Sequence, residues 1–210
     1  FLPQPLGLET VGLAAGHGAI SAFVNDQLTA PVLTALAELG ISLVALRCTG
    51  YNHVDVPTAQ QLGIRIVRVP SYSPHSVAEH AVALLLSLNR KTYLAYQRTK
   101  ENNFTLDGLM GFDLHGKRVG VVGTGKIGAA FARIMLGFGC RVMAYDKAPS
   151  AALQQLGVAF VPLEEVLEKA DVVSLHCPLT PETHHLINAD ALARMKPGAY
   201  LINTSRGGLL

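Results

Sequence analysis

A glycine pattern directly behind an apolar strand constrains this chain more than any other feature. The pattern G-x-G-x-x-G is formed by Gly123, Thr124, Gly125, Lys126, Ile127 and Gly128. It follows the apolar run 119–122 and opens an apolar-faced helical pattern. In such a turn the first glycine permits a tight bend, the second lets the backbone approach a pyrophosphate, and the third lets helix and strand pack closely. The sequence therefore predicts a strand–turn–helix unit whose helix N-terminus binds a dinucleotide phosphate.

Asp146 favours this interpretation over a glycine-rich turn without a ligand. It ends the next apolar run, 142–145, eighteen residues after Gly128. A carboxylate at this spacing can accept hydrogen bonds from the adenosine ribose and repels a 2′-phosphate. Lys147 beside it weakens the preference slightly. We therefore expect the cofactor to be NAD rather than NADP.

Apolar runs and helical patterns alternate along the chain, which is typical of parallel βαβ units. The predicted strands are 19–24, 41–46, 64–69, 118–122, 141–145, 158–161, 172–175 and 199–202. The predicted helices are 31–39, 58–62, 74–100, 126–136, 151–156, 163–169 and 190–195. The fold class is therefore α/β, with an incomplete flavodoxin-like substrate lobe over 1–73 and a Rossmann doubly wound parallel sheet over 74–210. Because 81–88 is apolar nearly all round, we expect it to be buried on more than one side, between lobes or at a subunit interface.

A polar turn after the last predicted strand carries a candidate ligand-binding arginine, Arg206. In open α/β sheets ligands bind outside the carboxyl ends of the strands, so this side chain is expected to point into the cleft. Its planar guanidinium suits a bidentate grip on a carboxylate. On position alone, an ordinary surface arginine in a turn is a serious alternative.

Composition argues against several other classes of protein. Seventeen Lys and Arg against fifteen Asp and Glu give a net charge of +2 without charged blocks, so we expect no nucleic-acid partner. The longest apolar run, 81–86, is too short to span a membrane. Three cysteines, Cys48, Cys140 and Cys177, without metal-ligand spacing fit a reduced cytoplasmic protein and no metal site. The chain starts without methionine and ends at Leu210, just after a glycine pair, so we expect missing segments at both ends.

Several strings together resemble the D-2-hydroxyacid dehydrogenase family, closest to its fermentative D-lactate dehydrogenase branch. They read R-C-T-G-Y-N-H-V-D at 47–55, V-P-S-Y-S-P at 69–74, V-A-E-H-A at 77–81, the glycine pattern at 123–128, H-C-P-L-T at 176–180 and N-T-S-R-G at 203–207. Their order covers essentially the whole chain. The resemblance implies an NAD-dependent enzyme that interconverts pyruvate and D-lactate, in a cleft between two lobes, as a homodimer.

The resemblance also implies roles for residues that position alone does not explain. Arg206 is expected to hold the substrate carboxylate and polarise its keto group. The backbone at Thr49 and Gly50 receives the carboxylate, and Tyr72 reaches the substrate from the other lobe. The segment beside the cofactor comprises His176, Cys177 and Pro178, and the segment bordering the nicotinamide comprises Asn203 and Thr204.

The family's catalytic acid, a histidine supported by a carboxylate, lies downstream of the position that matches Arg206. The chain therefore lacks both groups, and we expect it to bind NAD without turning over. Two alternatives stay open. One is a dehydrogenase for another D-2-hydroxyacid, such as hydroxyisocaproate, phosphoglycerate or glyoxylate. The other is a non-catalytic NAD-binding protein like the family's corepressors.

Overall fold

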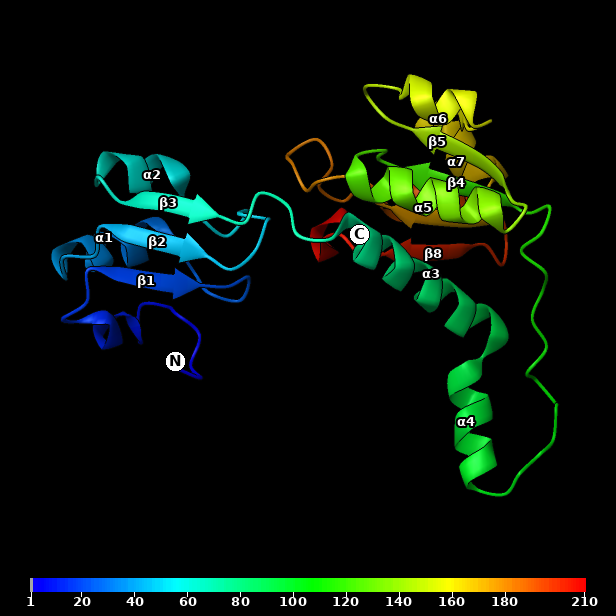
Figure 1. The fold of residues 1–210 in the computed structure, drawn as a ribbon, viewed down its shortest axis with the longest axis horizontal. Helices are drawn as coiled ribbons and strands as arrows, with labels where there is room; N and C mark the ends of the chain where they lie inside the picture. Colours follow the sequence, from blue (N-terminus) through cyan, green and yellow to red (C-terminus); the bar gives the residue numbers. More distant parts are fainter. Residues whose placement is uncertain (1) are drawn as a thin grey trace. The chain divides into compact units, whose positions relative to one another are not determined.

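The structure is a computed structural model that describes residues 2–210. The chain divides into two compact units, Phe1–Tyr72 and Ser73–Leu210, and each has its own hydrophobic core (Figure 1).

The first unit is a three-stranded parallel sheet with helices between its strands. Its strands are β1 (Ala19–Ala22), β2 (Leu43–Leu46) and β3 (Arg65–Arg68), in that spatial order. A short 3-10 helix η1 (Val11–Ala14) precedes them, and α1 (Ala30–Glu38) and α2 (Val56–Gln61) connect them. The carboxyl ends of the three strands therefore lie at one edge, where the following loops begin.

Local sequence explains how the helices of this unit begin and what they bury. In α1 a proline follows the first residue, where its missing N–H costs nothing. Asp55 caps α2 by accepting a hydrogen bond from the Thr58 backbone N–H at 3.0 Å. The apolar faces of both helices pack on the sheet, with Leu33, Leu36 and Val44 fully buried. Burial of these side chains fixes the α/β layer.

The second unit contains a five-stranded parallel sheet in the order β6-β5-β4-β7-β8. The strands are β4 (Arg118–Val122), β5 (Arg141–Tyr145), β6 (Ala159–Phe160), β7 (Val172–Leu175) and β8 (Tyr200–Asn203). Following the chain from β4, the strands β5 and β6 lie on one side of β4, and β7 and β8 lie on the other. This is the doubly wound topology predicted from the sequence, and the α/β fold class is confirmed.

Helices cover both faces of this sheet. They are α3 (Pro74–Arg90), α4 (Thr92–Lys100), α5 (Lys126–Gly137), α6 (Ala151–Gln155), α7 (Leu163–Lys169) and α8 (Ala189–Arg194), with a final 3-10 helix η2 (Gly207–Leu209). One core joins α3 and α5 to the sheet around Phe131 and Met135. The opposite core joins α7 and α8 to the sheet around Leu175. Both faces of the strands are apolar because both are buried.

The predicted continuous helix over 74–100 is wrong. It breaks at Lys91, which adopts the left-handed conformation with φ 49° between α3 and α4. The sequence carries no glycine or proline there to signal the break. The Lys91 ammonium donates to the Gly108 carbonyl at 2.6 Å, and this long-range hydrogen bond lies beyond the reach of local patterns.

The segment from Lys91 to Gly111, here called the arm, extends away from the sheet of its unit and returns (Figure 1). Its base is fixed by Asn89, which is 1% exposed. The Asn89 side chain accepts a hydrogen bond from the Phe112 N–H at 2.9 Å and donates one to the Phe112 carbonyl at 2.7 Å. Both polar groups of one backbone residue are thus satisfied by one buried amide.

The apolar run 81–88 is buried on one side only in the single chain. Ala81 and Leu85 are fully buried against the core. Leu84 and Leu88 are 38% and 46% exposed. Burial on more than one side, as expected from the sequence, therefore does not occur within residues 2–210.

Replacing Asn89 by alanine is expected to loosen the base of the arm, because the Phe112 N–H and carbonyl lose their partners. The free energy of local opening should fall by about 2 kcal/mol. Hydrogen exchange of the Phe112 amide in the full-length protein measures this. The exposed Asn103→Ala change, which removes only two local hydrogen bonds that Thr105 donates to the Asn103 side chain, is the control. Equal exchange rates in both variants would contradict the assigned role.

Candidate functional site

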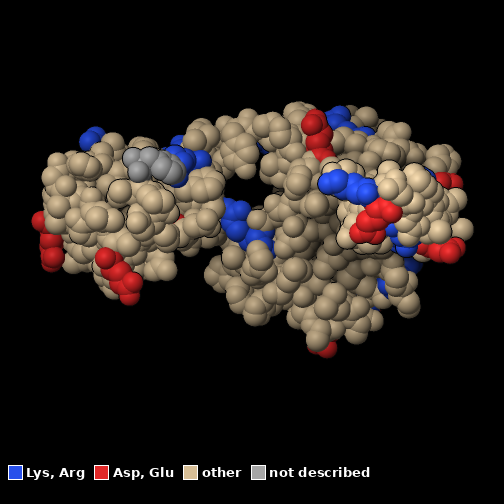
Figure 2. All heavy atoms as spheres, turned by 90° about the horizontal axis from the view of Figure 1, so that it is seen from below, with Lys and Arg blue, Asp and Glu red and all other residues tan. Residues whose placement is uncertain are grey.

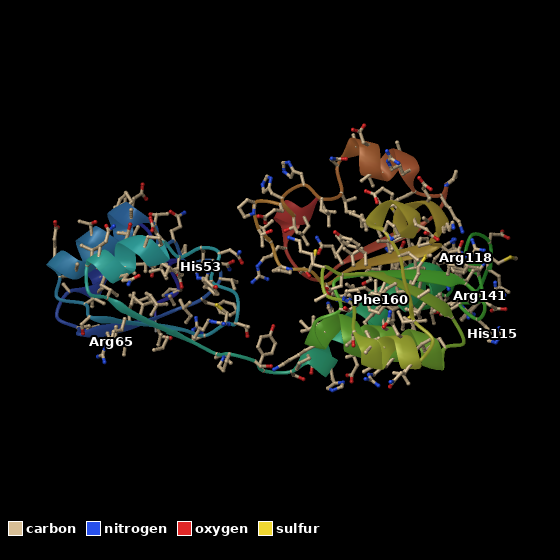
Figure 3. All side chains as sticks on the ribbon, turned by 90° about the horizontal axis from the view of Figure 1, so that it is seen from above. His53, Arg65, His115, Arg118, Arg141 and Phe160 are labelled. Atoms are coloured by element: carbon tan, nitrogen blue, oxygen red, sulfur yellow. The ribbon has the colours of Figure 1, made fainter. Side chains whose placement is uncertain are left out.

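The carboxyl edge of the five-stranded sheet gathers most of the residues singled out from the sequence. The glycine turn follows β4, which has β5 on one side and β7 on the other. The chain reverses its direction of winding at this point, where the loops after β4 and β7 diverge. Ligands of open α/β sheets bind at this switch point. The labelled cations Arg118 and Arg141 lie at the opposite, amino ends of their strands (Figure 3).

The glycine turn is tight enough that two of its glycines have no substitute. Gly123 has φ +90°, and an added Cβ would lie 2.6 Å from the Cys177 backbone nitrogen. At Gly128 a Cβ would collide with the Gly123 carbonyl oxygen. At Gly125, by contrast, nothing lies within 4 Å of an added Cβ. The first and third glycines therefore allow close packing, whereas the second faces open space in front of the helix.

The remaining residues of the turn complete the start of α5. Lys126 is exposed and Ile127 is half-buried against the core. The first N–H groups of an α-helix have no partner within the helix and attract anions. The open space at Gly125 lies beside these groups, so the turn offers both room and hydrogen-bond donors to a phosphate.

Asp146 is held at the end of β5 by the same turn. Its Oδ2 accepts hydrogen bonds from the Thr124 N–H at 2.6 Å and from the Thr124 hydroxyl at 2.9 Å, and its Oδ1 accepts one from the Ala148 N–H at 2.9 Å. Burial acts to raise the pKa of this carboxyl, but the hydrogen bonds from Ala148 and Thr124 outweigh it, so its pKa lies below the ordinary value. The group is therefore ionised at neutral pH. A carboxylate accepts about four hydrogen bonds, which leaves capacity for a ribose hydroxyl.

Thr124 is a site residue that the sequence analysis missed. It is 9% exposed and links the glycine turn to Asp146 through two hydrogen bonds. Its position between the first two glycines, together with a carboxylate at the end of the next strand, is a signal that could have identified it.

The segment after β7 lines the turn with a half-buried imidazole. His176 Nε2 shares a hydrogen bond with the Ser174 hydroxyl at 2.9 Å, and the ring packs on Phe131 with centroids 4.9 Å apart. Burial lowers the pKa of His176 to about 4, so the ring is neutral at pH 7. Burial also raises the pKa of the neighbouring Cys177 thiol. Neither side chain is charged, and both serve as packing beside the turn; Pro178 after them is exposed.

The loop after β8 folds back on itself around Arg206. Asn203 donates from its side-chain nitrogen to the Arg206 carbonyl at 2.8 Å and accepts from the Ser205 N–H at 3.0 Å. The half-buried Arg206 guanidinium makes one hydrogen bond, to the Ser205 carbonyl at 3.0 Å. The Thr204 hydroxyl oxygen is buried and has no partner among residues 2–210. The loop thus holds a cation and an unsatisfied hydroxyl at the carboxyl edge.

The predicted substrate residues Thr49, Gly50 and Tyr72 belong to the first unit. Thr49 and Gly50 lie in the loop after β2, at the carboxyl edge of the three-stranded sheet, and both are half-buried. The Thr49 hydroxyl oxygen is buried without a partner in the described part of the chain. Tyr72 ends the unit and is 68% exposed.

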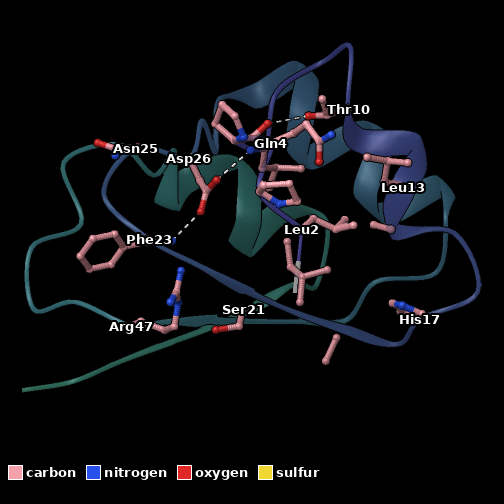
Figure 4. Close-up of a pocket in the computed structure, with 16 residues that line it drawn as sticks. Leu2, Gln4, Thr10, Leu13, His17, Ser21, Phe23, Asn25, Asp26 and Arg47 are labelled. Carbon is pink, nitrogen blue, oxygen red and sulfur yellow. Dashed lines mark hydrogen bonds between the residues drawn. The ribbon is translucent and has the colours of Figure 1, made fainter.

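A separate cavity of about 660 Å³ lies in the first unit beside β1 (Figure 4). Asp26 closes it by accepting hydrogen bonds from the Leu6 N–H at 2.7 Å and the Phe23 N–H at 2.6 Å. None of the residues predicted for the site lines it. The cavity therefore has no place in the chemistry inferred from the sequence.

Other classes of site find no support in the described residues. No group of three or more His, Cys, Asp or Glu within 2–210 is arranged to hold a metal ion. No helix in that range is long and apolar enough to cross a membrane. Acidic and basic side chains are interspersed on the face shown in Figure 2.

The fold and this edge define a dinucleotide-binding α/β protein, and comparison with known proteins identifies its family. Residues 82–210 match the family model for the NAD binding domain of D-isomer specific 2-hydroxyacid dehydrogenases. The chain belongs to this family. Its cofactor is NAD, as the sequence predicted.

Individual relatives agree with the family model. A 2-hydroxyacid dehydrogenase homolog of Zymomonas mobilis is 54% identical over 212 residues, covering 100% of this chain and 64% of the relative. The apo-structure of D-lactate dehydrogenase from Escherichia coli matches with a TM-score of 0.92 at 50% identity, covering 100% of this chain and 66% of that one. D-lactate dehydrogenase from Aquifex aeolicus, complexed with NAD and lactic acid, matches with a TM-score of 0.86 at 37% identity. This match covers 95% of this chain and 60% of that one. The chain spans less than two thirds of the length of the curated relatives it matches.

The residues present fit NAD on structural grounds. Gly125 leaves open space beside the N-terminus of α5, where a pyrophosphate can approach. Asp146 presents an ionised carboxylate suited to ribose hydroxyls. The partnerless Thr204 hydroxyl provides a further polar group at the same edge.

Alanine at Gly125 and at Gly128 should separate ligand binding from packing. Gly128→Ala forces its Cβ against the Gly123 carbonyl, so stability should fall by about 1–3 kcal/mol. Gly125→Ala should leave stability within about 0.5 kcal/mol and raise the NADH dissociation constant roughly tenfold, because the methyl group enters the pyrophosphate space. Thermal unfolding and NADH fluorescence titration measure the two effects. Unchanged NADH affinity in Gly125→Ala would contradict the assigned role of the second glycine.

Proposed function

We propose that the protein is an NAD-dependent oxidoreductase that interconverts pyruvate and D-lactate. The observation that carries this proposal is Arg206, a half-buried guanidinium in the loop after β8 of an NAD-binding domain. A positively charged planar group beside the cofactor edge suits the carboxylate of a 2-keto acid. Similarity to D-lactate dehydrogenase of Escherichia coli supports pyruvate as the substrate.

When bound, NADH would supply the hydride that the keto carbon accepts, and a proton must reach the keto oxygen. Arg206 binds the carboxylate and stabilises negative charge on the oxygen as it develops. Thr49 and Gly50 receive the carboxylate through backbone N–H groups, and Tyr72 contacts the substrate. Asn203 and Thr204 would border the nicotinamide, and the segment 176–178 would lie beside the bound cofactor. These roles rest on the family resemblance and on the positions described above.

We assign the proton-donating role to no histidine of this chain. His176 is neutral and already shares a hydrogen bond with Ser174. His184 and His185 are exposed and stack on each other with centroids 3.9 Å apart. We expect the donor to lie in sequence that follows Arg206 in the family.

The rival substrates within the family differ from pyruvate in size or in charge. Hydroxyisocaproate has a branched apolar chain, phosphoglycerate a phosphate, and glyoxylate no methyl group. Turnover of pyruvate should therefore exceed that of a branched keto acid if the pocket fits a methyl group.

Three free cysteines, two of them buried, support a reducing compartment such as the cytoplasm.

Arg206→Lys in the full-length protein is expected to lower kcat/KM for pyruvate reduction roughly a hundredfold, because lysine keeps the charge but loses the bidentate fork. NADH oxidation at 340 nm follows the reaction. Arg194→Lys, on the exposed surface of α8 beside Glu168, is the matched control and should behave as wild type. If both variants keep full activity, Arg206 does not hold the substrate.

We further propose that the protein forms a homodimer through the arm and the exposed side of α3. The arm carries large apolar side chains in water, with Phe104 74%, Leu106 80% and Met110 87% exposed. Leu84 and Leu88 on α3 add to this surface. Exposed apolar groups on an element held in place by hydrogen bonds are typical of an interface. A second copy of the chain is the partner that the family resemblance implies.

Leu106→Asp is expected to shift the full-length protein from dimer to monomer, because a charge in an apolar interface must be desolvated. Light scattering after size exclusion gives the mass. Leu192→Asp on α8, where the leucine is 52% exposed, is the control and should stay dimeric. A wild-type monomer at micromolar concentration would contradict the proposal.

A further inference from the structure

We propose that Arg68 is a positioning residue that orients the backbone N–H of Gly50 toward the substrate carboxylate. The inference deepens the proposed function and rests on it. Arg68 is the last residue of β3, next to β2 in the sheet, and it pairs in register with Leu46 at the end of β2. Its side chain therefore starts beside the loop that contains Thr49 and Gly50.

Two contacts tie Arg68 to this loop. Its Nη1 donates to the Thr49 carbonyl oxygen at 2.9 Å. Its guanidinium carbon lies 5.1 Å from the centroid of the Tyr51 ring, over the ring. A hydrogen bond from a charged donor combined with a cation–π contact holds a guanidinium in one orientation. The neighbouring Cys48 thiol donates to the Gly50 carbonyl at 3.2 Å, which fixes the next peptide as well.

These contacts determine where the N–H groups of the loop point. Among residues 2–210 all peptide bonds are trans, so the carbonyl of Thr49 and the N–H of Gly50 point in opposite directions. By holding the carbonyl, Arg68 turns the N–H to the other side. In the next peptide, Cys48 holds the Gly50 carbonyl, so the Tyr51 N–H also points to the opposite side.

The N–H side of the loop is left for a ligand. Within the described chain, the backbone N–H groups of Thr49, Gly50 and Tyr51 have no hydrogen-bond acceptor. The Thr49 hydroxyl is buried there without a partner. Backbone N–H groups that are left without an acceptor in the protein are available to donate hydrogen bonds to an anion. A carboxylate is the anion that the proposed reaction brings to this loop.

The sequence could not have revealed this role. Arg68 lies nineteen residues from Thr49, and only the pairing of β2 with β3 brings them together. A surface arginine without a role in the site would not need to contact the Thr49 carbonyl. Here the two carbonyls that accept hydrogen bonds belong to the same two peptides whose N–H groups have no acceptor in the described chain. A hydrogen bond that only stabilised the fold would not require this coincidence.

The test compares Arg68→Met and Arg68→Lys with Arg65→Met in the full-length protein. Arg65 lies at the other end of the same strand, is exposed and lies far from the loop along the strand (Figure 3). Arg68→Met should raise the KM for pyruvate roughly tenfold and leave kcat and the KM for NADH within about twofold. Arg68→Lys should recover part of the loss, since its ammonium still donates a hydrogen bond. Arg65→Met should match wild type.

Each outcome separates this inference from the proposed function. An active Arg68→Met enzyme with an unchanged KM for pyruvate overturns the role of Arg68 alone. An equal rise in Arg65→Met also overturns it, because general charge then explains the effect. A wild-type protein that neither reduces pyruvate nor binds oxamate, an unreactive analogue, in calorimetry overturns the proposed function and this inference with it.

Discussion

The close approach of α5 to β4 and to the start of the loop after β7 is the constraint on which the second unit depends. No Cβ fits at Gly123 or Gly128, so backbone lies directly against backbone. This contact points the N-terminus of α5 at the carboxyl edge of the sheet and brings Thr124 within hydrogen-bond distance of Asp146. One packing requirement therefore creates both the turn that we propose to bind phosphate and the position of the carboxylate that we propose to bind ribose.

In the first unit, too, packing and hydrogen bonds orient backbone N–H groups, but here side chains hold the neighbouring carbonyls. Within the described chain, its loop after β2 contains backbone N–H groups without acceptors, and the side chains of Arg68 from β3 and of Cys48 within the loop hold the matching carbonyls. In both units we propose that backbone N–H groups receive an anionic part of the ligand and that neighbouring side chains fix their direction. Asp146 and Arg206 are proposed to act directly, through their charged side chains.

The features predicted from sequence are those that local patterns encode. Strands and crossovers followed from apolar periodicity, and the turn at 123–128 from its glycines, because only glycine fits there. The break at Lys91 could not be predicted, since it depends on a hydrogen bond to Gly108 and on Asn89 holding Phe112. The hydrogen bonds from Thr124 to Asp146 and from Arg68 to Thr49 could not be predicted either, because they depend on which strands are neighbours in each sheet. Periodicity also cannot tell an apolar face that is buried in the chain from one that stays exposed, so it did not predict the exposure of Leu84 and Leu88.

The central claim is that the turn after β4 and the carboxylate of Asp146 together select NAD. The most direct test is a pair of fluorescence titrations of the full-length protein with NADH and with NADPH under identical conditions. The ionised Asp146 beside the ribose should repel a 2′-phosphate, so NADH is expected to bind at least about tenfold more tightly. Equal affinity, or tighter binding of NADPH, would contradict the account.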